Sequence, residues 1–319
     1  MTEVAAVILG HTDPSQARRL IDALPDVPVF LHWDAKSRGE DGPPDGLPAR
    51  VHAVQARDTR LSSWSLVRAE LTALDDALRR TRAGHIAVLS GADYPLVPVP
   101  ELVDALTAWG DRSFLYNRAM PYPPWSTPRH DDGGLWRLRR RFVVRNDNVV
   151  APGGQPLRWP GRRELPVGLV PRAASQWKIY SNRDGLRLLR ALDHDPALVR
   201  FWRTSFIPDE SCAASILASP DLVGNEPLPL CAANAWHYDF PPGGDHPRTL
   251  SRDDLPALRE LRHAPLIAPA LPIHEKPPFP YRRFFVRKVT SSAGRLCDDL
   301  DTLRDEMPPS TTGSTGHLP

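Results

Sequence analysis

The sequence predicts an α/β protein in which a mostly parallel central sheet is covered by helices on both faces, a three-layer arrangement. Short apolar segments alternate along the chain with segments whose apolar residues recur at helical spacing, which is typical of such sheets. Gly, Pro, Asp and Ser punctuate these segments, as expected where strands and helices end. The chain has 319 residues, which is enough to bury a core on both faces of one sheet.

The first element expected is a buried strand over residues 4–9, which ends at Gly10 and His11. Asp13 and Pro14 then begin a helix, because aspartate caps free N–H groups and proline suits the first helical turn. Further strands are expected at 27–32, 51–55 and 85–89, and further helices at 65–80 and 99–109. Ligands of such sheets bind where parallel strands end, so the segments after these strands are the first candidates for a site.

One domain is expected over residues 1–300, with a loop-rich excursion at 120–171 that is rich in Pro, Gly and Arg. A disordered insert also fits the composition of that excursion. Its run WRLRRRF carries four arginines and fits either a solvated basic edge or an acceptor contact. Residues 301–319, which end in PPSTTGSTGHLP, are expected to form a disordered tail.

Charge, cysteines and the N-terminal segment narrow the class of protein. The formal net charge is +2, so no global field favours nucleic acid or a membrane surface. The three cysteines form no C-x-x-C pair, which fits a reducing compartment and argues against a zinc site. The first apolar run has seven residues and no basic flank, so it predicts a strand rather than a signal peptide or anchor. A cytoplasmic protein without a stable membrane anchor is therefore expected.

The usual nucleotide-binding and metal-binding patterns are weak in this chain. There is no G-x-G-x-x-G or Walker loop. Two D-x-D triplets begin at Asp193 and Asp299, but neither follows a buried strand, so both are interpreted as solvated faces. Asp93 does follow a buried strand; as a single carboxylate it supports metal binding only weakly.

The segment VFLHWDAKS ends the second expected strand and places His32, Asp34, Lys36 and Ser37 close together. An ionised carboxylate there suits hydrogen bonding to a nucleotide base or ribose. Asp34 fits the stabilisation of a turn equally well. The spacing alone does not separate these two roles.

The order of several segments resembles the core-2/I-branching N-acetylglucosaminyltransferase and peptide O-xylosyltransferase family (glycosyltransferase family 14). The matching segments are VILGHTDPSQARRLIDAL, VFLHWDAKS, SSWSLVRAELTAL, HIAVLSGADYPLVPVPEL, ASQWKIYSN, FIPDES, NAWHYDF with HPRTLSRDDL, and FFVRKV. Together they span about residues 4–290. The resemblance implies a GT-A-like fold, a UDP-sugar donor, inversion at the anomeric carbon and no metal cofactor. The absence of a D-x-D after a strand agrees with that expectation.

The resemblance also implies that Glu210 in FIPDES is the general base, because the family places this role on the glutamate of its P-[DA]-E motif. An inverting transfer needs one carboxylate to take the proton of the acceptor hydroxyl. The start of a helix should favour the ionised carboxylate, and Asp209 is expected to be the N-cap. From the residues alone, the acid pair also fits a helix cap without a catalytic role.

Without a metal, side-chain cations must stabilise the departing diphosphate. The resemblance places this role on Arg248 in HPRTL and Lys288 in FFVRK, with Arg287 as a further candidate. Lys288 stands out because the chain has only four lysines among 40 basic residues. The segment before FFVRK is longer than the family's pattern, so Lys276 is the alternative to Lys288.

The resemblance places the acceptor sugar at Trp236 and Tyr238, since an aromatic face stacks on a sugar and a phenol hydrogen-bonds its rim. A donor nucleotide and sugar pocket is expected from a larger set: His11, Asp34, Lys36, Trp64 with Ser63 beside it, Asp93, Gln176 and Trp177. His11 and His32 are expected to form hydrogen bonds at strand ends rather than to act as catalysts.

The resulting hypothesis is an inverting, metal-independent transferase that moves a sugar from a UDP donor to a hydroxyl. N-acetylglucosamine is the first expectation for the sugar and xylose the second, and the acceptor is a carbohydrate or a small hydroxylated molecule. Two alternatives stay open: a metal-dependent glycosyltransferase that uses Asp93, and a catalytically silent protein that binds a nucleotide sugar.

Overall fold

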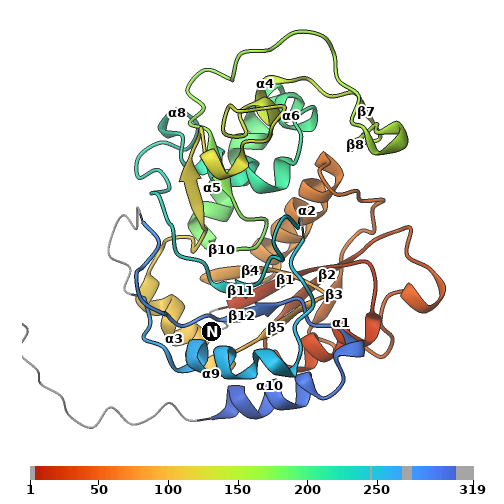
Figure 1. Cartoon of the computed structure of the whole chain (residues 1–319), viewed down its shortest axis with the longest axis vertical. Helices are drawn as coiled ribbons and strands as arrows, with labels where there is room; N and C mark the ends of the chain where they lie inside the picture. The colour runs from red at the N-terminus through yellow and green to blue at the C-terminus, as the bar shows by residue number, and fades with distance from the viewer. Residues whose placement is uncertain (1–3, 245, 268–274, 307–319) are drawn as a thin grey trace, which may run out of the picture.

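The computed structural model describes residues 4–244, 246–267 and 275–306. Its main sheet has five strands in the order β10-β4-β1-β2-β3, and all neighbours are parallel except β10 with β4 (Figure 1). These strands are β1 (Val4–Gly10), β2 (Val29–Trp33), β3 (Val51–Ala53), β4 (His85–Ser90) and β10 (Lys178–Ser181). A mostly parallel sheet within an α/β chain is thus confirmed.

Helices cover both faces of this sheet because the central strands are apolar on both sides. In β1, residues Ala5, Val7 and Leu9 belong to one core cluster, which also holds side chains of α2 (Trp64–Arg80) and α5 (Asn182–His194). The alternate residues of β1 belong to a second cluster with side chains of α1 (Pro14–Asp22) and α3 (Val99–Trp109). Strand side chains alternate between faces, so one strand serves both cores.

A second, three-stranded sheet has the order β11-β12-β5. Its strands are β5 (Asp93–Pro95), β11 (Trp236–Tyr238) and β12 (Phe285–Arg287). A third core cluster joins this sheet to α9 (Leu255–His263) and α10 (Leu296–Asp305). This sheet brings three segments that are far apart in sequence to the carboxyl ends of β1 and β4.

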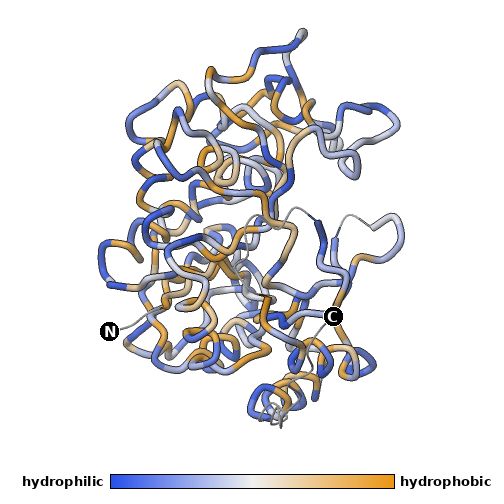
Figure 2. The backbone as a smooth tube through the Cα atoms, turned by 90° about the vertical axis from the view of Figure 1, so that its left-hand side faces the viewer, coloured by the Kyte–Doolittle hydropathy of each residue, from blue (hydrophilic) through white to orange (hydrophobic). Residues whose placement is uncertain are grey.

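The segment 120–171 folds into turns and short elements in the upper part of the molecule (Figure 1). The short elements within and directly flanking this segment are β6 (Asn117–Ala119), η2 (Pro123–Trp125), α4 (Trp136–Arg139), β7 (Val144–Arg145), β8 (Asn148–Val149), η3 (Pro152–Gly154) and β9 (Arg172–Ala174). Apolar segments run through both the upper and the lower part of the molecule (Figure 2). Leu138 and Leu169 of the excursion are buried in the first core cluster, so the excursion is folded and the disordered alternative is wrong.

Most expected elements are present with shifted ends. Asp13 caps α1, since its side chain accepts a hydrogen bond from the Gln16 N–H. The strand expected at 27–32 starts two residues later, and the strand at 51–55 stops at Ala53. The tail was expected from residue 301, but α10 continues to Asp305; residues 307–319 lie outside the described part.

The remaining elements are η1 (Gly39–Asp41), α6 (Pro196–Arg203), η4 (Pro208–Glu210), α7 (Cys212–Leu217), α8 (Pro220–Val223), η5 (Arg252–Asp254) and η6 (Ser291–Ala293).

Both D-x-D triplets lie in helical surroundings and are used for structure. Asp195 caps α6 through its side chain, and Asp301 forms ion pairs with Arg19 and Arg304. The three cysteines are buried and free.

Candidate active site

The two acids of FIPDES form a tight turn of their own, η4, rather than the first turn of a helix. The turn follows Ile207, whose φ of 50° is left-handed, and the helix α7 begins only at Cys212 with Ser211 at its N-cap position. The expectation that Asp209 is the N-cap is therefore wrong, and α7 is a separate helix of six residues. The two carboxylates also point to different environments, since Asp209 is buried whereas the Glu210 side chain is 35% exposed.

Glu210 is held by a cation from the excursion. The Arg137 Nη1 donates to the Glu210 Oε2 at 3.0 Å, and the guanidinium of Arg137 stacks over the Trp125 ring at 4.0 Å. Burial nevertheless raises the pKa of Glu210, with Arg137 opposing that shift. The expected lowering of its pKa by a helix dipole is thus not seen, because the turn lies outside α7.

The fold raises the pKa of the Asp209 carboxyl group to near neutral pH. Burial, and then the adjacent Glu210, raise its pKa to about 7. Its Oδ1 is buried without a hydrogen-bond partner in the part of the chain that the structure describes. An oxygen buried in this way is costly to ionise.

Asp209→Asn is therefore expected to stabilise the protein near neutral pH. A carboxyl group whose pKa is raised on folding weakens the fold as the pH rises from its unfolded value towards the folded one. The gain should be on the order of 2–4 kcal/mol at pH 8 and should disappear below about pH 4, because one pKa unit corresponds to 1.36 kcal/mol. Urea unfolding of both proteins across this pH range measures the effect; an equal difference at every pH would contradict it.

The second sheet brings three of the predicted site residues into one row. Register pairs Tyr238 of β11 with Arg287 of β12, and Arg287 with Asp93 of β5. Cross-strand partners share a face of the sheet, so these side chains are neighbours. The Arg287 guanidinium also stacks over the Trp177 ring at 4.1 Å, which adds a fourth predicted residue to the group.

The Asp93 carboxylate already has three hydrogen-bond donors around it. It accepts hydrogen bonds from Arg287 at 2.7 Å, from the Ser90 N–H at 2.9 Å and from the Trp236 Nε1 at 3.1 Å. The side chain is buried, and burial raises its pKa. A metal or a donor hydroxyl would have to displace these partners to reach Asp93.

Trp236 is buried as well, and its ring stacks on Phe285 at 5.0 Å between centroids. The structure therefore contradicts the expectation that Trp236 offers an aromatic face to the acceptor. Tyr238 is half-buried, and its hydroxyl accepts a hydrogen bond from the Asn234 Nδ2 at 2.8 Å. Burial raises the pKa of Tyr238, and the negative charge of Glu210 adds to that shift.

Lys288 follows Arg287 and is half-buried, and no described side chain forms an ion pair with its ammonium. Burial and the charge of Arg287 lower its pKa. His11, at the end of β1, feels the charges of both Arg287 and Lys288, and burial is the main reason that its pKa is lowered. Three groups that can carry positive charge thus gather at the end of β1. Lys276, the alternative to Lys288, is exposed.

Arg248 lies next to Lys288 through the backbone, since the Leu250 N–H donates to the Lys288 carbonyl at 2.8 Å. Its guanidinium, however, is bound by Asp239 at 2.6 Å and by both oxygens of Asp254 at 2.9 and 2.5 Å. These bonds raise the pKa of Arg248. Arg248 is in the expected place, but it already has two carboxylate partners.

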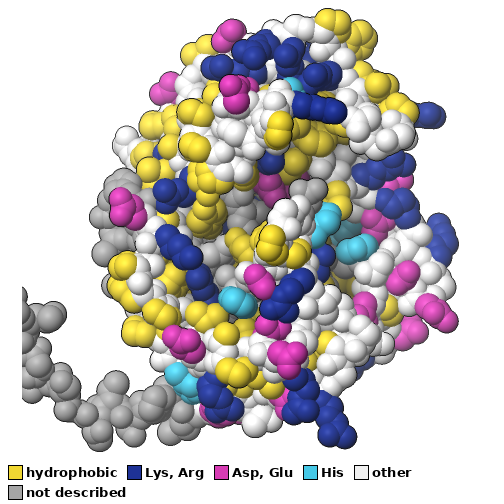
Figure 3. All heavy atoms as spheres, viewed as in Figure 1, with side chains coloured by type: hydrophobic (Ala, Val, Ile, Leu, Met, Phe, Trp, Pro, Cys, Tyr) yellow, Lys and Arg dark blue, Asp and Glu magenta, His cyan; other side chains and the backbone are white. Residues whose placement is uncertain are grey.

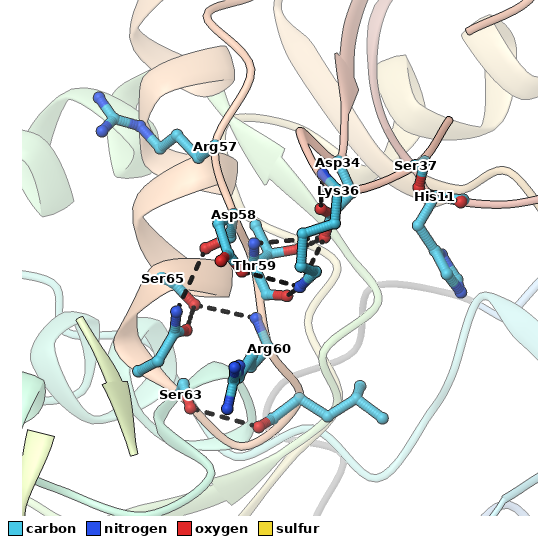
Figure 4. Close-up of polar contacts among 12 residues, drawn as sticks. His11, Asp34, Lys36, Ser37, Arg57, Asp58, Thr59, Arg60, Ser63 and Ser65 are labelled. Atoms are coloured by element: carbon cyan, nitrogen blue, oxygen red, sulfur yellow. Dashed lines mark hydrogen bonds and ion pairs between the residues drawn. The ribbon is translucent and has the colours of Figure 1, made fainter. Parts of the chain in front are cut away.

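Asp34 and Lys36 tie the end of β2 to the loop before α2 (Figure 4). The Asp34 carboxylate accepts from the Lys36 N–H at 2.8 Å and from the Thr59 Oγ1 at 2.5 Å. The Lys36 ammonium donates to Asp58 at 2.8 Å. Asp34 therefore stabilises a turn, which is one of the two roles that the sequence left open for it. Its bond to Thr59 also holds the loop 57–60 in place.

The other predicted donor residues divide into surface and core positions. Gln176 and Trp177 are half-buried, and the Trp177 ring lies against Arg287. Trp64 is buried in the core under α2, which leaves little of its ring for a donor contact. Ser63 accepts a hydrogen bond from the Val149 N–H at 3.0 Å. His32 accepts a hydrogen bond from the Arg57 N–H, so its expected role at a strand end is confirmed.

The residues of the excursion that lie near Glu210 were not among the predicted site residues, although the run WRLRRRF was interpreted as a solvated basic edge or an acceptor contact. Arg137 contacts Glu210 directly, and Trp125 supports Arg137. The Tyr122 ring contacts the Trp125 ring edge to face, with 6.0 Å between the ring centroids. The Tyr122 hydroxyl lies 3.1 Å from the Tyr116 hydroxyl. The run WRLRRRF was the available signal, and one of its arginines does reach the acid turn.

The molecular surface is hollowed between the upper and lower parts on the face shown in Figure 3, and Lys and Arg side chains gather over the upper part.

The described residues include no group of three or more His, Cys, Asp or Glu side chains placed to hold a metal ion. In the described part, no helix has the length and apolar character needed to cross a membrane.

The solved structures that resemble the chain distantly include the following two. One is described as a glucose-1-phosphate thymidylyltransferase from Bacillus anthracis in complex with sucrose; it is 10% identical, with a TM-score of 0.28, over 58% of this chain and 74% of that one. The other is HddC from Yersinia pseudotuberculosis, 13% identical, with a TM-score of 0.25, over 56% of this chain and 77% of that one. The comparison with curated proteins found no match.

A family model described as Core-2/I-Branching enzyme matches residues 28–229, well over half of the chain. The match includes the acid turn with Glu210 but ends before Tyr238, Arg248 and Lys288. The mostly parallel sheet agrees with the GT-A-like fold expected of such a protein. The chain belongs to the Core-2/I-Branching enzyme family and is a glycosyltransferase.

Proposed function

We propose that the protein transfers a sugar from a UDP-sugar to an acceptor hydroxyl with inversion, and that Glu210 is the general base. The observation that carries this proposal is that the Glu210 side chain, bound by Arg137, is 35% exposed, while its neighbour Asp209 is buried. One acid of the pair can therefore reach a bound acceptor. Geometry of this kind is the first requirement for a general base.

The reaction is a single displacement at the anomeric carbon. The Glu210 carboxylate accepts the proton of the acceptor hydroxyl while the acceptor oxygen forms its bond to that carbon. The bond from the carbon to the donor's phosphate oxygen breaks on the opposite side, and UDP leaves with the electron pair. Arg137 limits the basicity of Glu210 but also holds its carboxylate in one place.

Cations at the end of β1 serve the leaving diphosphate in this proposal. Lys288 has no side-chain anion partner among the described residues, and Arg287 and His11 lie near it. Preorganised positive charge stabilises the charge that develops on a leaving group. Arg248 holds the backbone next to Lys288 and reaches the diphosphate only if it leaves Asp239 or Asp254.

N-acetylglucosamine is the first candidate for the transferred sugar and xylose the second, because these are the donors that the sequence resemblance implies. A panel of UDP-sugars screened by thermal shift tests the donor. A ligand at 100 times its Kd stabilises the folded state by about 2.7 kcal/mol. Stabilisation by one UDP-sugar, and not by uridine alone, is the expected result; no shift with any UDP-sugar would contradict the proposal.

Activity is expected to survive an excess of EDTA. Asp93, the strand-end carboxylate that could hold a metal, is bound by Arg287 and Trp236, and the proposed diphosphate contacts are side-chain cations. The rate of UDP release with and without EDTA measures this. Complete loss of activity, restored by Mn²⁺ or Mg²⁺, would favour the metal-dependent alternative.

The rate of transfer is expected to fall as the pH drops through the pKa of Glu210, because only the ionised carboxylate accepts a proton. Burial raises that pKa, so the acid limb should lie above the ordinary glutamate value of about 4.3. A pH profile of kcat/KM measures the limb in the free enzyme. The residual activity of Glu210→Gln should lack it, and a limb retained in that variant would assign the titration to another group.

A further inference from the structure

A buried cation that the proposed reaction does not use lies next to the acid turn. The Lys178 ammonium donates to both oxygens of Glu70, at 3.0 and 3.1 Å, and the Tyr180 hydroxyl donates to the same carboxylate at 2.6 Å. The side chains of Lys178 and Glu70 are each only 2% exposed. They come from β10 and α2, so the pair joins the edge of the main sheet to a helix that covers it.

Lys178 also reaches the acid turn. Its ammonium lies 3.5 Å from the Asp209 carbonyl oxygen. A small cavity between the turn, α2 and β10 is lined by Glu70, Lys178, Asp209 and Cys212, among others. The cationic end of the Lys178–Glu70 ion pair thus lies on the buried side of a turn that carries two carboxylates, one of them the proposed base.

The stability of the fold alone gives little reason for this arrangement. The cost of desolvating a buried ion pair offsets most of its attraction, and well-packed apolar replacements are often neutral or stabilising. The chain also prefers arginine almost everywhere, with four lysines among 40 basic residues. One of those four is buried here, where a compact ammonium acts as a point charge.

We propose that Lys178 acts through Glu210 as a positioning residue, its buried ammonium holding the proposed base in the ionised form that can accept a proton. This inference rests on the proposed function, because it has a consequence for catalysis only if Glu210 is the base.

Charged and titratable groups surround the turn on several elements. Glu70 on α2, Lys178 and Tyr180 on β10, and Cys212 on α7 line the cavity beside Asp209. Arg137 on α4, His246 in the loop that follows β11, and the Tyr238 phenol on β11 interact electrostatically with Glu210. Burial raises the pKa of Glu210, and the charges of Arg137, Lys178 and His246 lower it. Lys178 acts from the buried side, where solvent screens its charge least.

The test compares pH profiles of UDP release by the full chain from UDP-GlcNAc and from UDP-xylose, with water as acceptor. The main variant is E70Q/K178M, because Lys178→Met alone would leave Glu70 buried and unpaired and could prevent folding. The acid limb should move up by about one pH unit, which makes release about tenfold slower at pH values below the limb. At pH 9 the rate should approach that of the wild type, because Glu210 is then ionised in both proteins.

Two further variants keep the test decisive. Glu70→Gln leaves the Lys178 ammonium buried without its anion, so circular dichroism must first show that this variant folds; its acid limb should then move to lower pH, opposite to the double variant, because the cation remains. Tyr180→Phe removes a hydrogen bond to Glu70 but no charge, and its acid limb should stay in place. An acid limb that is unmoved in E70Q/K178M, or a loss of rate that is equal at every pH, would overturn the proposal, because a purely structural role gives the second result.

Glu210→Gln, measured in parallel, separates this inference from the proposed function. If that variant is inactive and the limb of E70Q/K178M does not move, only the role of Lys178 is wrong. If Glu210→Gln releases UDP at the wild-type rate, or if the wild type releases no UDP from either donor, both proposals fall.

Discussion

Replacing Glu210 by Gln is expected to lower the rate of sugar transfer by about 10²- to 10⁴-fold, the usual contribution of a general base. Glutamine keeps the shape of the side chain and can still contact Arg137, but it cannot take a proton from the acceptor. UDP affinity should hardly change, because the proposed diphosphate cations lie at the end of β1 and not at the acid turn. Initial rates and calorimetry with UDP measure the two quantities.

Asp209→Asn is the matched control for that experiment. It changes the neighbouring acid in the same way, but the Asp209 side chain is buried, which keeps it from taking a proton from a bound acceptor. We expect it to keep most of the activity. A Glu210→Gln enzyme that transfers sugar at the parental rate would show that Glu210 is not the base, and would leave a nucleotide-sugar-binding role or another base as the explanation.

Lys288→Ala is expected to weaken UDP binding by about 10- to 150-fold. A hydrogen bond to a charged group contributes roughly 1.5–3 kcal/mol, and 1.4 kcal/mol is a factor of ten. Uridine, which lacks phosphates, should bind the variant as well as it binds the wild type. Arg248→Ala should have a smaller effect, because Asp239 and Asp254 already bind that guanidinium. Calorimetry with UDP and with uridine measures both ligands.

Lys276→Ala is the matched control, since Lys276 is exposed and its replacement by alanine removes the same charge. It should leave UDP affinity unchanged. The reverse result, with intact binding in Lys288→Ala and loss of binding in Lys276→Ala, would show that the long segment before FFVRK shifts the motif. The assignment of the diphosphate site to the end of β1 would then be wrong.

The alternation of strands and helices could be predicted because local patterns determine it. The run from Val4 to Leu9 and the Asp13-Pro14 pair both carry their signal within a few residues. The antiparallel edge strand β10 was not predicted. It has only four residues, too few for a period to show, and it depends on pairing with β4 far away in the sequence.

The chemistry of the candidate site was harder to predict, because distant residues decide it. Glu210 was identified by its motif, but its ion pair with Arg137 joins two segments 73 residues apart. Asp93 and Arg287 were each predicted to contact the donor, and instead they bind each other across β5 and β12. Trp236 was expected to stack on the acceptor sugar, yet its ring lies in the core. A sequence shows which groups are present, but not which of them neutralise one another.

The most direct test of the central claim uses azide as the acceptor in Glu210→Ala. Azide attacks a carbon without losing a proton, so it needs no base, and it is small enough to enter the space left by the missing side chain. With an α-linked UDP-sugar, azide is expected to restore UDP release in Glu210→Ala and to give the β-glycosyl azide, as ¹H NMR of the anomeric proton will show. No acceleration by azide, or an α-glycosyl product, would contradict a single inverting displacement with Glu210 as its base.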